Sequence, residues 1–207
     1  MNRGVGPELF PDVSRETRER LGAYAELLEK WNPKINLVSA STLVEVWTRH
    51  FLDSAQILDL AEVGAKLWAD LGTGGGFPGL VVAILAKDLR PHMQVVCVES
   101  DQRKATFLRT VVRETGISAR ILSKRIEDIE PLGADVVSAR ALAPLPKLLD
   151  HASRHLATGG HALLLKGAGY QKEVNDALES WSFGLDTYPS KTDPDAVILK
   201  IGDIRRV

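Results

Sequence analysis

A chain of 207 residues with 44% hydrophobic content can bury a substantial core, yet it is too short for two full enzyme domains. The formal net charge of -1 argues against a uniformly basic nucleic-acid binder, although basic side chains can still gather on one surface. Because Cys97 is the only cysteine, and because neither an export signal nor a run of about 18 apolar residues occurs, we expect a cytoplasmic protein without disulfides, a bound metal or a membrane span.

The beginning of the chain predicts two amphipathic helices. From Ser14 onward, apolar residues recur at spacings of three and four, which predicts a helix that Ser14 caps and Pro33 ends. The same spacing over residues 42–58 predicts a second helix. We therefore divide the chain into an N-terminal helical extension, residues 1–62, packed on a larger domain, residues 63–207.

In the larger domain, short apolar strands alternate with helices. The predicted strands are residues 67–72, 93–99, 119–123, 134–139, 161–166 and 196–201, and the predicted helices between them are residues 77–86, 101–115, 146–155 and 170–181. Such alternation predicts an α/β fold with a largely parallel sheet covered by helices on both faces. Ligands of these folds bind at the carboxyl ends of the strands.

A glycine-rich loop, DLGTGGGFPG at residues 70–79, joins the first predicted strand to the first helix of the domain. Gly74, Gly76 and Gly79 match the pattern G-x-G-x-x-G, in which bare backbone approaches the pyrophosphate of a dinucleotide. Asp70 favours another ligand, because a carboxylate would repel a pyrophosphate but can pair with the ammonium of an amino acid.

Glu99 ends the second predicted strand, where an acidic side chain can accept hydrogen bonds from both hydroxyls of a ribose. An adenosine that carries a methionine tail satisfies both Asp70 and Glu99, so the sequence predicts an S-adenosyl-L-methionine site and a methyltransferase. In the loop after the third strand, Ile126 would lie against the adenine while Glu127 reads its polar edge. An exposed acidic helix start explains these two residues equally well.

Several acceptor atoms require residues that the chain lacks. Methylation of a pyrimidine C5 needs a thiolate, but Cys97 lies in the middle of a strand, and residues 138–141 read SARA where enzymes that methylate exocyclic amines usually carry an Asn-Pro-Pro-aromatic motif. Lys166, at the end of the fifth strand, would assist a ribose hydroxyl, so that acceptor stays open. A ring nitrogen such as guanine N7 carries a lone pair and no proton, so alignment suffices and we predict no catalytic base.

The chain resembles the bacterial ribosomal RNA small subunit methyltransferase G family, also called glucose-inhibited division protein B. Five segments carry the resemblance: WNPKINLVS at 31–39, RHFLDS at 49–54, DLGTGGGFPG at 70–79, SARA at 138–141 and LLLKG at 163–167. In the fourth of them, Ala139 separates Ser138 from Arg140, whereas the family more commonly reads Ser-Arg-Ala. The resemblance spans nearly the whole chain. It implies a Rossmann-like class I methyltransferase with a mostly parallel seven-stranded sheet.

The resemblance also implies methylation of N7 of a guanine in 16S ribosomal RNA, with that RNA or the small ribosomal subunit as partner. It carries cofactor contacts over to Gly72, Phe77, Ile126, Glu127 and Arg140. With the residues argued above, the predicted cofactor site is Asp70, Gly72, Gly74, Phe77, Glu99, Ile126, Glu127 and Arg140. Arg140 and Lys166 lie at strand ends and are the predicted substrate-binding residues.

Three other functions remain open at this point. The first is a methyltransferase acting on another RNA position, such as a ribose hydroxyl. The second is a nicotinamide-dependent oxidoreductase, which depends only on the pattern of Gly74, Gly76 and Gly79. The third is a non-catalytic RNA-binding module that keeps a Rossmann-like scaffold.

Overall fold

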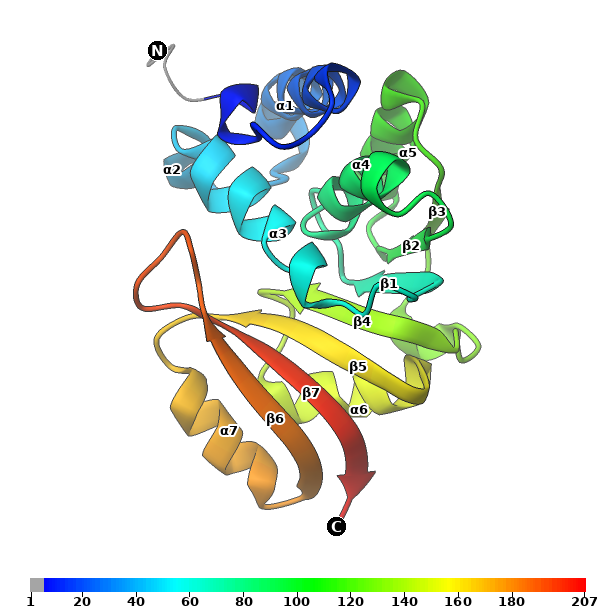
Figure 1. Ribbon diagram of the computed structural model, residues 1–207, viewed down its shortest axis with the longest axis vertical. Coiled ribbons are helices and arrows are strands. Elements are labelled where there is room, and N and C mark those ends of the chain that lie inside the picture. Colours follow the sequence, from blue (N-terminus) through cyan, green and yellow to red (C-terminus); the bar gives the residue numbers. More distant parts are fainter. Residues whose placement is uncertain (1–5) are drawn as a thin grey trace.

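A seven-stranded sheet runs through the computed structural model, which describes residues 6–207 (Figure 1). The strands are β1 Leu67–Leu71, β2 Gln94–Val98, β3 Ala119–Leu122, β4 Ala134–Arg140, β5 Leu156–Lys166, β6 Trp181–Pro189 and β7 Val197–Arg206. In the order β3-β2-β1-β4-β5-β7-β6, neighbours from β3 to β5 are parallel, whereas β7 is antiparallel to both β5 and β6. The predicted α/β fold with a mostly parallel sheet is confirmed.

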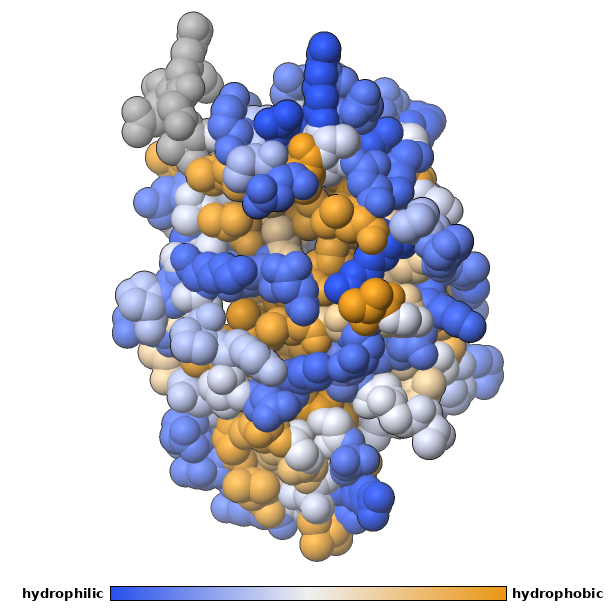
Figure 2. All heavy atoms as spheres, viewed as in Figure 1, coloured by the Kyte–Doolittle hydropathy of each residue, from blue (hydrophilic) through white to orange (hydrophobic). Residues whose placement is uncertain are grey.

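Helices cover both faces of the sheet and divide the core into two parts. On one face lie α1 (Arg15–Ile35), α4 (Gly79–Leu89) and α5 (Gln102–Thr115), and on the other lie α6 (Leu145–His155) and α7 (Tyr170–Leu178). Because successive side chains of a strand point to opposite faces, Trp68 of β1 enters the first core and Ala69 enters the second. In Figure 2, hydrophilic side chains cover much of one face of the molecule, and apolar side chains show between them.

Helix α1 (Arg15–Ile35) begins as predicted and ends later than predicted. The side chain of Ser14 accepts a hydrogen bond from a backbone N–H of the first turn, which confirms it as the cap. The prediction that Pro33 ends the helix is wrong, because the helix continues for two more residues. In the last turn a proline removes only one helical hydrogen bond, and the side chain of Asn32 accepts the N–H of Leu37 (2.8 Å) to close the end instead.

The prediction of one regular helix over residues 42–58 is also wrong. The chain there forms α2 (Ala40–Leu43), a π-helical turn (Trp47–Leu52), α3 (Asp53–Ala55) and a 3-10 turn (Leu58–Leu60). The spacing of apolar residues distinguishes a helix from a strand, but it does not distinguish an α-turn from the wider π-turn. Residues 1–5, the start of the predicted extension, lie outside the described residues.

Strand β6 is absent from the pattern that the sequence predicts. The helix expected over residues 170–181 ends at Leu178, and the chain then returns along β7 as an antiparallel edge strand. Most side chains of β6 are exposed, so it lacks the apolar pattern that reveals a buried strand. Within the described range, no helix combines the length and apolar composition needed to cross a membrane.

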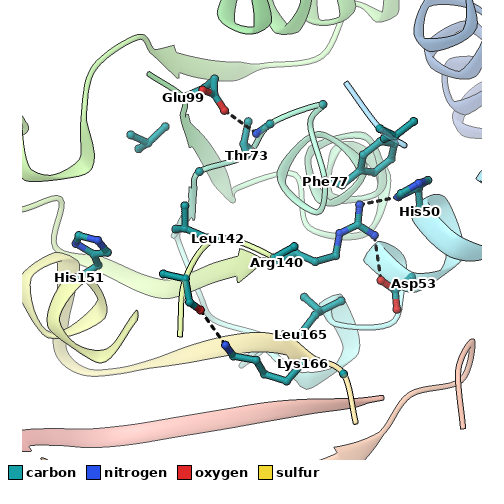
Figure 3. A pocket seen from close by; sticks show the side chains of 18 of the residues that line it. His50, Asp53, Thr73, Phe77, Glu99, Arg140, Leu142, His151, Leu165 and Lys166 are labelled. Carbon is teal, nitrogen blue, oxygen red and sulfur yellow. Dashed lines mark hydrogen bonds and ion pairs between the residues drawn. The ribbon is translucent and has the colours of Figure 1, made fainter. Parts of the chain in front are cut away.

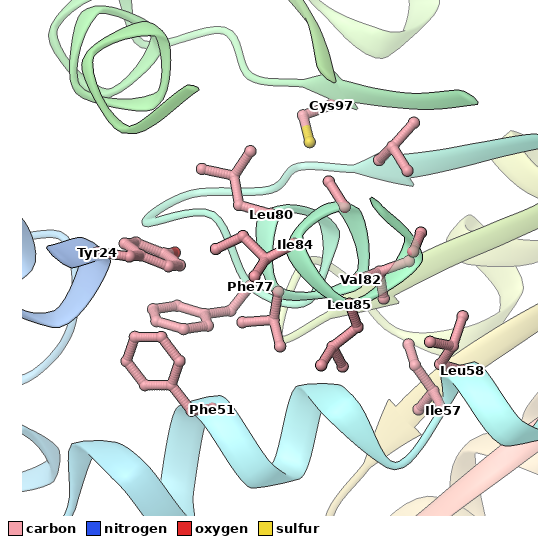
Figure 4. Close-up of a cluster of buried hydrophobic side chains, with 14 of the residues drawn as sticks. Tyr24, Phe51, Ile57, Leu58, Phe77, Leu80, Val82, Ile84, Leu85 and Cys97 are labelled. Carbon is pink, nitrogen blue, oxygen red and sulfur yellow. The ribbon is translucent and has the colours of Figure 1, made fainter. Parts of the chain in front are cut away.

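Tyr24 fastens α1 to the glycine-rich loop. Its ring is fully buried and stacks on Phe77, with ring centres 5.3 Å apart, and its hydroxyl donates a hydrogen bond to the carbonyl oxygen of Gly75 at 2.5 Å (Figure 4). The loop and the N-terminal helices therefore share one aromatic cluster, which also contains Phe51.

We expect Tyr24→Phe to lower the free energy of unfolding by about 1 to 2 kcal/mol, because the buried carbonyl of Gly75 loses its donor while the ring packing stays. Urea unfolding followed by circular dichroism measures this change. The matched control is Tyr188→Phe, since the half-buried Tyr188 hydroxyl has no hydrogen-bond partner among residues 6–207. An equal loss in both variants would contradict the role given to the Tyr24 hydroxyl.

Candidate functional site

A cavity of about 1050 Å³ lies at the carboxyl ends of the parallel strands, where the strand order reverses between β1 and β4. Its wall includes Gly72 after β1, Glu99 after β2, Arg140 at the end of β4 and Lys166 at the end of β5. Of the predicted cofactor residues, all but Asp70 line the cavity. The structure thus brings together residues that the sequence separates by almost a hundred positions, and their contact with a ligand remains a prediction.

The glycine-rich loop has a backbone that other residues cannot readily adopt. Gly72 and Gly76 have φ angles of 65° and 100°, in the region that favours glycine. A Cβ at Gly72 would collide with Leu142, and one at Gly76 would collide with the hydroxyl of Tyr24. These two glycines therefore let Leu142 and Tyr24 pack directly against the loop, while Gly72, Gly74 and Gly75 line one side of the cavity.

Asp70 lies beneath this loop rather than at the cavity wall. Its side chain is fully buried; one carboxylate oxygen accepts the hydroxyl of Ser138 at 2.7 Å, and the other accepts the N–H of Gly79 at 2.9 Å and the hydroxyl of Thr73. The predicted pairing of Asp70 with a ligand ammonium therefore needs correction. Its oxygens are turned toward protein donors, so it stabilises the loop instead of lining the site.

Burial raises the pKa of Asp70 to about 6, and the hydrogen bonds from Thr73, Ser138 and Gly79 oppose this shift. The carboxyl group is therefore ionised at neutral pH, and these hydrogen bonds reduce the free-energy cost of burying its charge. The same donors come from the loop, from β4 and from the start of α4, so the carboxylate joins three parts of the site.

Glu99 combines a structural contact with access to the cavity. Its carboxylate accepts the backbone N–H of Gly74 at 2.9 Å and that of Asp101 at 2.7 Å, and the residue is 8% exposed (Figure 3). Each carboxylate oxygen has two lone pairs, so each keeps room for one further donor. This capacity fits the predicted hydrogen bonds to ribose hydroxyls.

Ile126 and Glu127 occupy the end of the cavity near α6. Ile126 is buried, whereas the exposed Glu127 pairs with Lys147 at 3.3 Å and lies 3.7 Å from His151. A backbone hydrogen bond, followed by that from Lys147, lowers the pKa of Glu127. One apolar and one anionic side chain thus lie side by side on the cavity wall, as the adenine interpretation requires.

Arg140 reaches from β4 to the N-terminal segment. Its guanidinium donates to Asp53 at 3.0 Å and to Nδ1 of His50 at 2.8 Å, and it lies 5.1 Å from the ring centre of Phe77. In Figure 3 this side chain extends toward His50 and Asp53, on the side away from Glu99 and His151. Arg140 thus separates the glycine-loop end of the cavity from an end formed by the N-terminal segment.

His50 is held in its neutral form. A guanidinium can only donate, so Nδ1 accepts from Arg140 and the ring proton lies on Nε2, which donates to the hydroxyl of Thr42 at 2.8 Å. Burial, followed by the charges of Arg140 and Arg49, lowers the pKa of His50 to about 3. Both ring nitrogens are engaged, so His50 has no free lone pair to act as a base.

The ammonium of Lys166 lies against Glu173 rather than free in the cavity. It donates to the Glu173 carboxylate at 2.6 Å and to the carbonyl oxygen of Ala143 at 3.0 Å, and its side chain is 9% exposed. Activation of a ribose hydroxyl by Lys166 would require this ion pair to break. The ribose acceptor is therefore disfavoured by the geometry. Among residues 6–207, no group of three His, Cys, Asp or Glu side chains is arranged to hold a metal ion.

Several residues that line the cavity carry no signal in the sequence that predicts a role for them. They come from the N-terminal segment and from the loop between β6 and β7, and include Thr42, Arg49, His50, Asp53, Thr192 and Asp193. The RHFLDS motif contained three of them, but a motif alone does not show which side chains face the site. No motif in the sequence pointed to the β6–β7 loop as part of the site, since β6 itself was not predicted.

Comparison with known proteins gives consistent matches. A family model described as GidB, rRNA small subunit methyltransferase G, matches residues 17–193. The ribosomal RNA small subunit methyltransferase G of Ruegeria pomeroyi is 54% identical over 196 residues, covering 95% of this chain and 96% of that protein. The protein of the same name from Paracoccus denitrificans is 50% identical and covers 93% of this chain and 98% of its own length.

Solved structures with low sequence identity share the fold. A TehB-like SAM-dependent methyltransferase from Corynebacterium glutamicum has a TM-score of 0.59 at 17% identity, over 88% of this chain and 99% of that chain. An O-methyltransferase from Bacillus cereus in complex with SAH has a TM-score of 0.57 at 15% identity, over 95% of this chain and 96% of that chain. The predicted class I methyltransferase fold is thereby confirmed.

The raised pKa of Asp70 makes stability depend on pH in a specific direction. An aspartate in the unfolded chain has a pKa of about 3.9, so between about pH 4 and pH 6 the folded protein retains a proton that the unfolded chain has lost. The unfolding free energy of the wild type, relative to that of Asp70→Asn, should therefore fall by at most about 3 kcal/mol as pH rises through this window. Urea unfolding of both proteins from pH 4 to pH 7 measures the difference. Parallel pH profiles would contradict the assignment.

Proposed function

The chain belongs to the rRNA small subunit methyltransferase G family, and we propose that it transfers the methyl group of S-adenosyl-L-methionine to N7 of a guanine in 16S ribosomal RNA. Family membership supports the coarser statement, methylation of small-subunit ribosomal RNA. We add to this statement that the methylated base is guanine, that the acceptor atom is N7 and that the RNA is 16S ribosomal RNA. The observation that carries it is the cavity at the switch point of the sheet, lined by seven of the eight predicted cofactor residues.

The residues present fit the cofactor. A Cβ at Gly74 would meet only the carbonyl oxygen of Gly72, at 3.9 Å, so the loop backbone is open to a ligand there, and Glu99 retains acceptor capacity for a ribose. Ile126 and Glu127 would hold the adenine, while Arg140 would pair with the carboxylate of the methionine part. When bound, the cofactor supplies a methyl group on a positively charged sulfur.

Guanine N7 suits a site without a base. Its lone pair forms the new bond to the methyl carbon as the carbon–sulfur bond breaks, so no proton has to leave. The residues therefore need only align the two partners and exclude water, and effective molarities of about 10⁵ M and above are attainable by alignment. The engaged nitrogens of His50 and the engaged ammonium of Lys166 agree with this chemistry.

The N-terminal segment belongs to this machinery. Thr42, His50 and Asp53 line the cavity, and His50 and Asp53 hold Arg140. We propose that residues 1–62 form an extension of the methyltransferase domain, residues 63–207, and complete its site. The partner that this site would receive is 16S ribosomal RNA or the small ribosomal subunit.

The test uses small ribosomal subunits from a strain that lacks the enzyme. Incubation with the purified protein and labelled S-adenosyl-L-methionine should give 7-methylguanosine in the nucleosides of 16S RNA, detected by mass spectrometry. Label in another nucleoside would overturn the acceptor, and label only in a small metabolite would overturn the RNA substrate. Calorimetry with NAD and S-adenosyl-L-methionine side by side tests the oxidoreductase alternative, which the family relationship disfavours.

Gly72→Asp should lower methyl transfer at least about 100-fold, because a side chain at this φ angle collides with Leu142 and adds a charge to the loop. Gly169→Asp is the matched control, since a Cβ there meets nothing within 4 Å and the φ of -79° is ordinary. Circular dichroism verifies that both variants fold. Full activity of a folded Gly72→Asp would argue for a cofactor site elsewhere.

A further inference from the structure

The cavity extends past Arg140 into a region that the predicted cofactor residues do not occupy. We call this region the acceptor lobe; it is lined by Thr42, Arg49 and Asp53 from the N-terminal segment and by Ser190, Thr192 and Asp193 from the β6–β7 loop. In Figure 1 the β6–β7 loop reaches from the far edge of the sheet toward α2 and α3. The lobe is thus formed by two segments that lie outside the parallel part of the sheet.

An ion pair spans this lobe. Nη1 of Arg49 lies 2.8 Å from Oδ2 of Asp193, and the two side chains are 43% and 30% exposed. Arg49 has further N–H donors, and each carboxylate oxygen of Asp193 keeps a free lone pair, although Oδ1 also accepts the N–H of Asp195 at 3.0 Å. That backbone hydrogen bond, followed by Arg49, lowers the pKa of Asp193, which keeps the acceptor ionised.

Two further contacts hold the β6–β7 loop in position. The hydroxyl of Thr192 donates to Asp53 at 3.0 Å, and the backbone N–H of Lys191 donates to the side-chain oxygen of Gln56 at 2.8 Å. These two contacts already join the β6–β7 loop to the N-terminal segment. The remaining N–H donors of Arg49 and the adjacent free lone pairs of Asp193 are therefore available to bind a ligand.

We propose that Arg49 and Asp193 recognise the acceptor base by its N1, N2 and O6 edge, an inference that rests on the proposed function. Guanine presents the acceptor O6 beside two donors, N1–H and N2–H, which match an arginine donor beside a carboxylate. Adenine and cytosine present an amino donor beside a ring-nitrogen acceptor, which is the reverse order. Uracil places a second carbonyl oxygen against the carboxylate. The pair therefore selects guanine.

This recognition leaves the reacting atom uncovered. A guanine held by N1, N2 and O6 keeps N7, which belongs to its other ring, free of any hydrogen bond to the pair. The lone pair of N7 then faces away from Asp193. Arg140 lies between the acceptor lobe and the glycine-loop end of the cavity, where the cofactor would bind. One orientation of the base thus provides both selectivity and access to N7.

The decisive variants are Arg49→Asp, Asp193→Arg and the double exchange of both. The double variant can restore an ion pair across the lobe, but it exchanges the donor and the acceptor that face the base. We expect each single variant to lose about 10- to 100-fold in kcat/KM for small ribosomal subunits. The double variant should remain as low, and affinity for S-adenosyl-L-methionine should stay within about twofold of wild type by calorimetry, since a base contact leaves the cofactor site unchanged.

Lys172→Asp is the control, because it makes the same charge reversal in a more exposed ion pair, with Asp176 on α7, outside the cavity. Recovery of kcat/KM in the double variant would show that the pair only fastens the loop and would overturn the proposal. Single variants that keep wild-type kcat/KM, or that lose cofactor affinity instead, would also overturn it. If the wild type forms no 7-methylguanosine, the proposed function fails and this inference fails with it, whereas the preceding outcomes leave the proposed function intact.

Discussion

The buried carboxylate of Asp70 is the constraint on which the site depends. It accepts hydrogen bonds from the glycine-rich loop, from β4 and from the start of α4, so these three segments meet in one arrangement. An unpaired buried carboxylate would be costly, and each donor that satisfies it is thereby fixed in place. The loop conformation, with glycine where other residues would collide, follows from this attachment together with the hydrogen bond from Tyr24 to Gly75.

A second set of contacts joins the N-terminal segment to β4. Arg140 extends from β4 and is satisfied by Asp53 and by neutral His50, which itself is held by Thr42. The wall of the cavity is therefore made partly by the parallel sheet and partly by the segment that precedes it. In a Rossmann-like domain ligands bind at the strand ends, and here the segment before the sheet adds Thr42, His50 and Asp53 to the wall of that cavity.

The sequence predicted the parallel part of the fold well because buried strands there are short, apolar and separated by capped helices. The helix predicted over residues 101–115 corresponds to α5, which Asp101 caps at its start and Gly116 ends. Strand β6 escaped prediction because its exposed side chains carry no apolar pattern, and its position depends on pairing with β7. Likewise, the end of α1 is determined by the side chain of Asn32, a contact that helix propensity does not include.

The site was predictable from the sequence where the backbone geometry requires particular residues. It was not predictable where tertiary contacts determine the direction of a side chain. Gly72 and Gly74, like Glu99 and Arg140 at strand ends, were identified from the sequence and line one cavity. The direction of the Asp70 side chain was not, because a carboxylate near the end of a strand can turn toward a ligand or toward the protein, and only the positions of Ser138 and Thr73 decide between them.

The π-helical turn at Trp47–Leu52 has a consequence for how the N-terminal segment tolerates change. Such a turn contains one residue more than an α-turn, and each residue of a helix rotates the following side chains by about 100°. Removing one residue from this turn would rotate the side chains that follow it to another direction. Asp53, which pairs with Arg140 of β4, is among them. The number of residues in this segment is therefore constrained, because it sets the direction in which Asp53 faces Arg140.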